Sequence, residues 1–333
     1  MNDNIILPNT PSIPGLTFRH FRGEADFSPL ADLISACKIA DKVDRTITVE
    51  DIARFFRHLE NCDPQDDMIF GEMDGRMIAH GRVWWDDLAD GLRLYHVDGL
   101  LLPEWRGKGI GTSLWKAGEH RAREIAFHHP KETPKVFNVE LFDTQQDHIA
   151  LLERQGYKPA RYEAHMVRDL SEPFPEAPMP PGLEVRPVKP EHLRPIFDGS
   201  NEAFRDHWGV RDESEEEYKS QMENPEFRPE LWKVAWDGDQ MAGVVHNFYV
   251  IKENEEYHRQ RGYTEGICTR RPWRKKGLAR ALIVQSMKMF KDMGMTETAL
   301  SVDAENLSGA LRLYESVGYR KVQQQIIFRK PME

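Results

Sequence analysis

The chain has 333 residues, of which 40% are hydrophobic and 30% are charged, and its formal net charge is −10. This length predicts about two domains, each with enough apolar material for a core. An acidic chain is a poor match for phosphate backbones, so we expect a small-molecule substrate and no nucleic-acid partner.

Cys37, Cys62 and Cys268 are too few and too far apart for a disulfide framework or a zinc site. They predict a reducing, cytoplasmic compartment and no bound metal. The first residues lack a basic segment followed by an apolar one, and no run approaches about 18 apolar residues. We therefore expect neither a signal peptide nor a membrane span.

The first half of the chain is expected to contain a strand, helices, three strands, a helix, a strand, a helix and a strand. In chain order these are 16–21, helical stretches within 27–62, strands near 67–73, 76–87 and 92–102, then 108–127, 137–142, 145–155 and 159–168. The second half repeats this order at 183–188, within 190–222, near 231–237, 240–251 and 260–269, then at 276–293, 298–303, 307–317 and 320–329. The order predicts an α/β (α+β) fold in which helices flank a mixed, largely antiparallel sheet in each copy.

Two turns that contain glycine reveal the internal repeat. Residues 97–111 read VDGLLLPEWRGKGIG and residues 265–279 read EGICTRRPWRKKGLA, with Gly109 and Gly277 aligned at an offset of 168. Further along, ALLERQGY and LRLYESVGY align at an offset of 162, so the first copy has about six extra residues in a loop.

A boundary between the copies is expected in the segment SEPFPEAPMPPG, residues 171–182, which contains five prolines. This composition favours an extended linker. The predicted domains are therefore residues 1–170 and 183–333.

Both glycine turns lie between a predicted strand and a predicted helix. Glycine there lets the backbone approach a ligand, and it exposes the N–H groups of the helix's first turn, which favour a pyrophosphate. Lys275, Lys276 and Arg280 add positive charge in the second copy, and Lys108 does so in the first. Neither G-x-G-x-x-G before a helix nor G-x-x-x-x-G-K-[ST] occurs, which disfavours NAD and ATP.

The two turns match the pattern Q/R-x-x-G-x-G/A through Arg106, Gly109 and Gly111 in the first copy and Arg274, Gly277 and Ala279 in the second. The second copy also contains Asn306 and Tyr314 in ENLSGALRLYESVGY. On these motifs, nearly the whole chain resembles the GNAT N-acetyltransferase superfamily, with a tandem layout similar to mycothiol synthase. The resemblance implies acetyl-CoA as the acetyl donor.

The resemblance also implies which residues hold the donor, namely the end of one strand, the glycine turn and the start of the next helix. In the second copy these are Ile267, Cys268, Thr269, Arg274, Lys275, Lys276, Gly277, Leu278, Ala279, Arg280 and Asn306. In the first copy they are Leu101, Arg106, Gly107, Lys108, Gly109, Gly111 and Thr112. Asn306 is also a good helix N-cap residue, so a purely structural role is an alternative.

Acetyl transfer to an amine needs a base for the amine proton and an acid for the departing sulfur. An alkyl amine has a pKa of about 10.4, so few molecules are nucleophilic at neutral pH without a base. The resemblance places the base at Glu265 and the acid at Tyr314. A salt-bridged strand carboxylate and a packing tyrosine are the alternative interpretations.

The first copy lacks this pair when the same offsets are applied. They give Leu152 in place of the tyrosine, Thr144 in place of the asparagine and Val97 in place of the glutamate, with Asp98 beside it. We therefore expect the N-terminal domain to be catalytically silent, although still able to bind CoA.

Asp206 and His207 follow the first helix of the second copy and are the candidates for binding the acceptor; a polar loop with a salt bridge is the alternative. Together these features predict a monomeric, cytoplasmic, acetyl-CoA-dependent N-acetyltransferase that acts on a primary amine of a small molecule by direct attack in the C-terminal domain. A non-enzymatic CoA-binding sensor and an acyltransferase that uses another acyl-CoA remain open.

Overall fold

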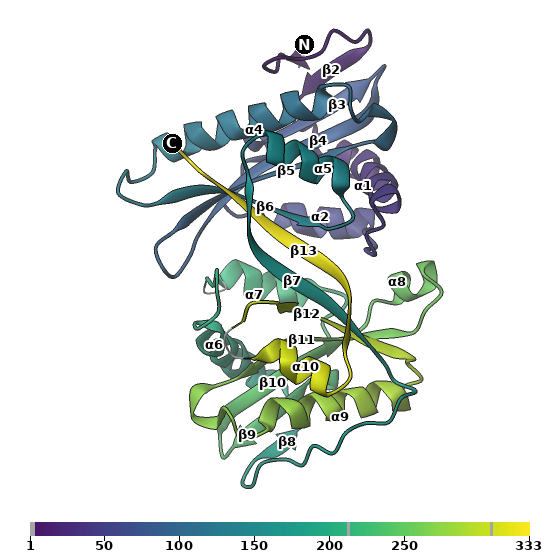
Figure 1. Cartoon of the computed structure of the whole chain (residues 1–333), viewed down its shortest axis with the longest axis vertical. Helices are drawn as coiled ribbons and strands as arrows, with labels where there is room; N and C mark the ends of the chain where they lie inside the picture. The colour runs from purple at the N-terminus through teal and green to yellow at the C-terminus, as the bar shows by residue number, and fades with distance from the viewer. Residues whose placement is uncertain (1–3, 212–213, 307–308) are drawn as a thin grey trace. The chain divides into compact units, whose positions relative to one another are not determined.

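The computed structural model describes residues 4–211, 214–306 and 309–333. The chain divides into two compact units. The N-terminal unit consists of Met1–Arg161 with Gln325–Glu333, and the C-terminal unit consists of Tyr162–Gln324. Both units are α/β, as predicted, and each contains a sheet flanked by helices (Figure 1).

The N-terminal unit follows the predicted order of elements. Its strands are β1 (Asn4–Ile5), β2 (Leu16–Arg19), β3 (Met68–Met73), β4 (Arg76–Asp87), β5 (Arg93–Leu101) and β6 (Lys135–Phe142). Its helices are α1 (Phe27–Asp41), α2 (Val49–Arg57), α3 (Pro64–Asp67), α4 (Ile110–Phe127) and α5 (Gln146–Arg154). The short elements β1 and α3 were not predicted.

The C-terminal unit repeats the order apart from a short helix at Ile251–Glu256, which was not predicted and begins where the predicted strand 240–251 ends. Its strands are β8 (Glu184–Arg186), β9 (Lys233–Asp237), β10 (Gln240–Phe248), β11 (Arg261–Thr269) and β12 (Glu297–Asp303). Its helices are α6 (Leu193–Phe204), α7 (Glu215–Glu223), α8 (Ile251–Glu256), α9 (Leu278–Asp292) and α10 (Ala310–Ser316). Residues 212–213 and 307–308, within two predicted helices, lie outside the described residues.

Two-residue turns join β3 to β4 and β9 to β10. In the first turn Asp74 and Gly75 have φ of 48° and 83°, which is the left-handed pair that a type I′ hairpin requires. In both hairpins the residues that flank the turn pair with each other, at Met73–Arg76 and Asp237–Gln240. This shared register aligns β4 with β10 residue by residue.

Each sheet is antiparallel apart from one parallel pair, β5 with β6 and β11 with β12. The β5–β6 ladder ends at His96–Asn138, although β5 continues to Leu101. The β11–β12 ladder ends at Tyr263–Ala299, although β11 continues to Thr269. The strands separate beyond these points, and the backbone groups along the gap need other partners.

In each unit one strand comes from the other sequence copy. Residues 325–331 of β13 (Arg320–Pro331) pair antiparallel with β6, and residues 163–169 of β7 (Lys158–Asp169) pair antiparallel with β12. Because the copies exchange these strands, the compact units differ from the predicted domains. The proline-rich segment belongs to the C-terminal unit, where its apolar side chains pack against the core.

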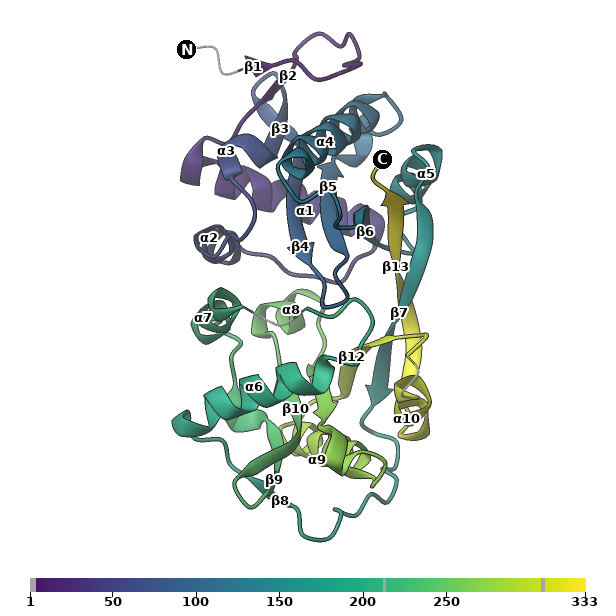
Figure 2. The same cartoon turned by 90° about the vertical axis from the view of Figure 1, so that its left-hand side faces the viewer.

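Helices cover both faces of each sheet (Figures 1 and 2). In the N-terminal unit α4 and α1 both pack against β4 and β5, and in the C-terminal unit α9 and α6 both pack against β10 and β11. None of the helices in the described segments combines the length and the apolar character that crossing a membrane would require.

The exchanged strands contribute to the cores. Phe328 of β13 is 1% exposed and packs in the N-terminal core, and Met166 of β7 is 1% exposed and packs in the C-terminal core. Phe328→Ala should therefore destabilise the N-terminal unit, by about 3–5 kcal/mol for a buried Phe→Ala change. Hydrogen exchange should show lost protection in β6 and not in β12.

Met166→Ala is the reciprocal control, and it should reduce protection in β12 and leave β6 protected. If Phe328→Ala loosened β12 instead, the strand exchange would be refuted.

Candidate active site

The two glycine turns have the same backbone conformation. Gly109 is the N-cap of α4 with φ of 89°, and Gly277 is the N-cap of α9 with φ of 84°. Two residues earlier, Gly107 and Lys275 are also left-handed, at 72° and 60°. A Cβ atom added at Gly277 would meet no atom within 4 Å, so the backbone angle, and not crowding, requires glycine there.

The backbone amides at the start of both helices lie outside the helical ladder. The N–H of Ser113 donates to Gly109 O at 3.1 Å, and the N–H of Ala281 donates to Gly277 O at 3.0 Å. These are the first hydrogen bonds of the helical series in α4 and α9. The amides before them, with the positive end of the helix dipole, form a site that suits an anion. Lys275 and Lys276 are exposed beside the C-terminal turn.

The arginine of each turn fastens the turn to the rest of its unit. Arg106 donates from Nε to Leu101 O at 3.2 Å and from both Nη atoms to Asp41 at 2.6 and 2.9 Å. Arg274 donates from Nε to Thr269 O at 2.9 Å and from Nη1 to Asp206 at 2.5 Å. The side chain that the motif specifies is therefore engaged within the protein, which leaves anion contacts to the backbone amides.

Asp206 also pairs with Arg271, at 2.5 Å, and these hydrogen bonds from Arg271 and Arg274 hold the pKa of its carboxyl far below the usual range. The structure thus places Asp206 against the arginines of the glycine turn, where its carboxylate has two cationic partners. His207 packs edge-on against Phe204 with ring centroids 4.7 Å apart, and burial lowers the pKa of its imidazole. His207 is therefore neutral at pH 7.

Glu265 lies where β11 and β12 separate. Its Oε1 accepts the backbone N–H of Ser301 at 3.0 Å, so the carboxyl replaces the strand partner that Ser301 lacks on this side. Desolvation raises the pKa of Glu265 to about 8, although the hydrogen bonds from Ser301 oppose this shift. A carboxyl with such a pKa can accept a proton near neutral pH.

Tyr314, on α10, is 6% exposed. Burial raises the pKa of its hydroxyl, and the charge of Glu265 adds to the shift. Asn306 lies in the turn after β12, where its N–H donates to Asp303 O at 3.1 Å. It is not the N-cap of α10, because Gly309 occupies that position.

Cys268 is not a nucleophile in this structure. Burial raises the pKa of its thiol to about 11, and its Sγ lies 3.9 Å from Ser200 Oγ. At neutral pH the thiol is therefore protonated and weakly nucleophilic. Its neighbour Ile267 packs against the core of the unit, and Thr269 provides the carbonyl that Arg274 holds.

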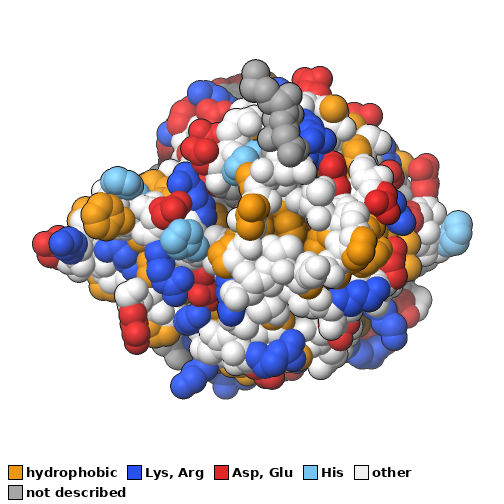
Figure 3. All heavy atoms as spheres, turned by 90° about the horizontal axis from the view of Figure 1, so that it is seen from above, with side chains coloured by type: hydrophobic (Ala, Val, Ile, Leu, Met, Phe, Trp, Pro, Cys, Tyr) orange, Lys and Arg blue, Asp and Glu red, His pale blue; other side chains and the backbone are white. Residues whose placement is uncertain are grey.

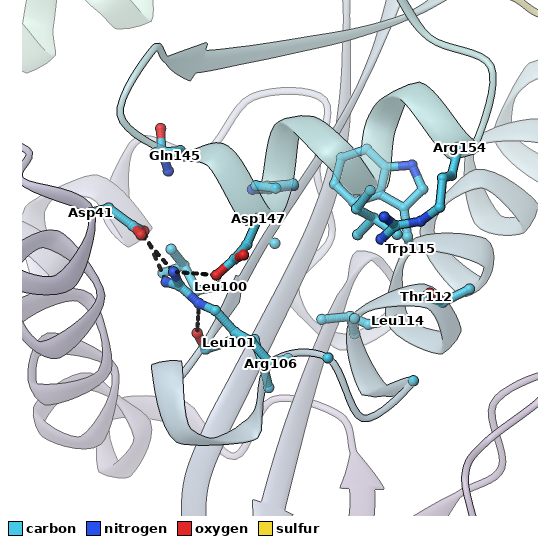
Figure 4. Close-up of a pocket in the computed structure, with 16 residues that line it drawn as sticks. Asp41, Leu100, Leu101, Arg106, Thr112, Leu114, Trp115, Gln145, Asp147 and Arg154 are labelled. Atoms are coloured by element: carbon cyan, nitrogen blue, oxygen red, sulfur yellow. Dashed lines mark hydrogen bonds and ion pairs between the residues drawn. The ribbon is translucent and has the colours of Figure 1, made fainter.

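The N-terminal unit contains a cavity of about 320 Å³ beside its glycine turn (Figure 4). Most of the predicted donor-binding residues of this copy line it, namely Leu101, Arg106, Gly107, Gly109, Gly111 and Thr112. Lys108 is not part of the lining, and its Nζ lies 4.4 Å from the centre of the Trp105 ring. In Figure 4 Arg106 reaches Asp41 and Asp147 on one side, and Trp115 and Arg154 lie on the other.

The strand register corrects one equivalence between the copies. Glu265 pairs with His246 on β10, and the residue of β4 that aligns with His246 is Arg82, which pairs with Asp98. The position that corresponds to Glu265 is therefore Asp98 and not Val97. A bulge near Val245 gives β11 one extra residue that β5 lacks, and a fixed offset does not detect it.

Sequence reasoning missed the contribution of α5 to the cavity. Gln145, His148 and Leu151 line it from this helix and the residue before it, together with Arg154. Their spacing of three residues is the available signal, since it places them on one side of the helix. The sequence gives no indication that this side faces a cavity.

Known proteins resemble the chain in both halves. The family model described as Acetyltransferase (GNAT) family matches residues 31–157 and again 193–319. The mycothiol acetyltransferase of Thermobispora bispora is 27% identical over 181 residues, which are 53% of this chain and 59% of that protein. The mycothiol acetyltransferase of Geodermatophilus obscurus is 24% identical over 258 residues, 77% of this chain and 79% of that one.

A solved structure covers the chain almost completely. The crystal structure of a GCN5-related N-acetyltransferase from Sphaerobacter thermophilus matches with a TM-score of 0.71 and 26% identity, over 98% of this chain and 97% of that one. Together with the two matches of the family model, this confirms the predicted tandem arrangement.

The raised pKa of Glu265 predicts how stability depends on pH. The folded chain binds this proton more tightly than the unfolded chain, so the stabilisation is complete below about pH 4.3 and is lost as the pH rises to about 8. Glu265→Gln keeps an oxygen for the N–H of Ser301 and carries no charge. The variant should therefore gain stability over the parent as the pH rises, by at most about 1.4 kcal/mol per pH unit.

Urea denaturation between pH 5 and pH 9 measures this difference. Glu140→Gln, at an exposed position on β6, is the control and should show no such trend. If the free energies of unfolding of the parent and of Glu265→Gln changed with pH in parallel, water would reach the Glu265 carboxyl freely.

Proposed function

Because the chain belongs to the GNAT acetyltransferase family and is an enzyme of that family, we propose that its C-terminal unit transfers an acetyl group from acetyl-CoA to the primary amine of a small molecule. The observation that carries the proposal is Glu265, a desolvated carboxyl with a pKa of about 8 at the strand end that leads into the glycine turn. A base of this strength, next to an anion-binding turn, suits direct attack by an amine.

The residues of the C-terminal turn fit the donor. The amides of residues 276–280 would bind its pyrophosphate, helped by Lys275 and Lys276, and the space beyond Gly277 is open. The end of β11, at Ile267–Thr269, would lie along the pantetheine arm, where its backbone N–H groups polarise a carbonyl. Bound acetyl-CoA supplies the thioester that the amine attacks.

Two side chains move the protons. Oε1 of Glu265 is occupied by the N–H of Ser301, so Oε2 takes the proton of the amine, directly or through one water. Tyr314 gives its hydroxyl proton to the departing sulfur. The negative charge that Glu265 loses on protonation also eases ionisation of Tyr314, because that charge raises the pKa of the tyrosine.

The rest of the chain supports a small acceptor and a monomer. Positive and negative side chains are interspersed on the face seen from above, as Figure 3 shows, and the net charge is −10. On this face the charges do not gather into the basic stripe that nucleic acid needs. Because each copy lends a strand to the other, β6 and β12 are both paired within one chain, which favours a monomer. The three free cysteines favour a cytoplasmic location.

The proposal for the donor is tested by Gly277→Glu. A side chain at this left-handed position strains the turn, and its negative charge would repel a pyrophosphate. Calorimetry with CoA should show one fewer site per chain and loss of acetyl transfer. Gly109→Glu is the matched change in the N-terminal unit and should remove the other site while acetyl transfer persists. Two intact sites in a folded Gly277→Glu chain would contradict the assignment.

The catalytic pair is tested by pH–rate profiles with one accepted alkyl amine. Tyr314→Phe removes only the hydroxyl and should lower kcat at least about tenfold with little change in CoA affinity. In the parent, kcat/KM should rise as Glu265 loses its proton near pH 8. Glu265→Gln should lose this inflection and lower the rate most above about pH 8, where the parent has a charged carboxylate and most of the amine is still protonated. The difference should shrink at low pH, where the parent carboxyl is protonated, and again as the pH approaches the amine pKa of about 10.4.

Tyr157→Phe is the matched control, because this tyrosine is also buried but packs in the core of the N-terminal unit. It should leave kcat unchanged. Persistence of the inflection near pH 8 in Glu265→Gln would assign it to another group.

A further inference from the structure

The N-terminal cavity contains a titratable group that the proposed function does not use. His148 lines it together with Gly99 at the end of β5 and the glycine turn at Gly107–Gly109. The imidazole packs edge-on against Trp115, with ring centroids 5.2 Å apart. Among the described residues, none forms a hydrogen bond with either ring nitrogen, so both nitrogens remain available to a molecule in the cavity.

The surroundings of His148 keep it neutral. Desolvation lowers the pKa of its imidazole, and the nearby charge of Arg106 lowers it further. The carboxylates of Asp98 on β5 and Asp41 on α1 oppose these effects. A neutral imidazole can accept a proton during a reaction, and the negative charges of Asp98 and Asp41 favour the cation that forms.

These groups lie on the strand and the helix that correspond to those carrying the catalytic pair proposed for the C-terminal unit. Asp98 occupies the register position of Glu265, as shown by the cross-strand pairs. His148 lies on α5, the counterpart of the helix that carries Tyr314, and one turn before Leu152. The N-terminal unit therefore lacks the tyrosine hydroxyl but has another group that can carry a proton in the same cavity.

We propose that the N-terminal cavity is a second acyl-transfer site, in which His148 carries the proton from an attacking amine to the departing sulfur and Asp98 stabilises the imidazolium. The proposal rests on the binding of a CoA thioester to this unit. As the amine nitrogen bonds to the acyl carbon, His148 accepts the proton of that nitrogen. The carbon–sulfur bond breaks with its electron pair on sulfur, and His148 returns the proton to the sulfur, giving an amide and a thiol.

The lining of the cavity and the state of His148 together indicate the class of acceptor. Leu114, Trp115 and Leu151 line the cavity and offer apolar side chains for an aromatic ring to pack against. An imidazole whose pKa is lowered takes a proton poorly from an alkylammonium ion, whose pKa is about 10.4. An arylamine is unprotonated at neutral pH and needs a base only as it attacks. The N-terminal site should therefore prefer arylamines, whereas Glu265 gives the C-terminal site a base suited to alkyl amines.

The test uses the full chain with Tyr314→Phe and Glu265→Gln, which disables the C-terminal route. With acetyl-CoA, this chain should release thiol faster in the presence of 4-methoxyaniline than in that of hexylamine. Adding His148→Gln should lower the arylamine-dependent rate at least about tenfold. Adding His120→Gln, an exposed histidine on α4, should leave it unchanged.

Two readouts independent of turnover complete the test. The NMR signal of the His148 ring, assigned by its loss in His148→Gln, should titrate below about pH 6.5 and shift when CoA is added. Calorimetry on the Gly277→Glu chain should show one CoA site, which His148→Gln leaves intact. Asp98→Asn is the second variant if His148→Gln does not fold, and it should lower the pKa of the His148 ring and slow the arylamine reaction.

The outcomes separate the two proposals. No CoA site in the Gly277→Glu chain would overturn donor binding to the N-terminal unit and, with it, the second reaction. An intact CoA site with no arylamine-dependent rate, or with a rate that His148→Gln leaves unchanged, would overturn the second reaction alone.

Discussion

The separation of the parallel strand pair is the constraint on which both sites depend. In each unit the hydrogen bonding between the two parallel strands stops before the strands end. The last pairs are His96–Asn138 in one unit and Tyr263–Ala299 in the other. Backbone groups along such a gap need new partners. In the C-terminal unit Glu265 provides one by accepting the N–H of Ser301, and this position removes the carboxyl from water. The separation of β11 and β12 therefore leaves a desolvated carboxyl at the gap, which we propose as the base.

The glycine turns belong to the same arrangement, because each follows the strand that has lost its partner. In both units the arginine of the turn donates to the last strand carbonyl and pairs with an aspartate, Asp41 or Asp206. These bonds of the arginine hold the turn in place, so that the first amides of the next helix point away from the helix. This explains why both copies keep the arginine, whereas the left-handed position two residues before the N-cap is glycine in one copy and Lys275 in the other.

Much of the fold and part of the site could be predicted from sequence. Alternating apolar residues and Asp-Gly turns locate most strands, and the repeated glycine turns locate the elements that we propose bind the donor. The exchange of the last strands could not be predicted, because the apolar faces of β7 and β13 fit either sheet and sequence order favours the wrong one. Asp98 was misplaced because a bulge adds one residue to β11, and a constant offset cannot register it. The role of His148 depends on which side of α5 meets the cavity, which is set by tertiary packing.

A crystal structure of the chain with CoA tests the central claim most directly. We predict that, in the C-terminal unit, the pyrophosphate accepts hydrogen bonds from the backbone amides of residues 276–280 and that the thiol lies beside β11 within reach of Glu265 and Tyr314. We also predict that Arg274 keeps its bonds to Thr269 O and Asp206. A pyrophosphate bound by the Arg274 side chain, or a thiol far from the gap between β11 and β12, would contradict the account.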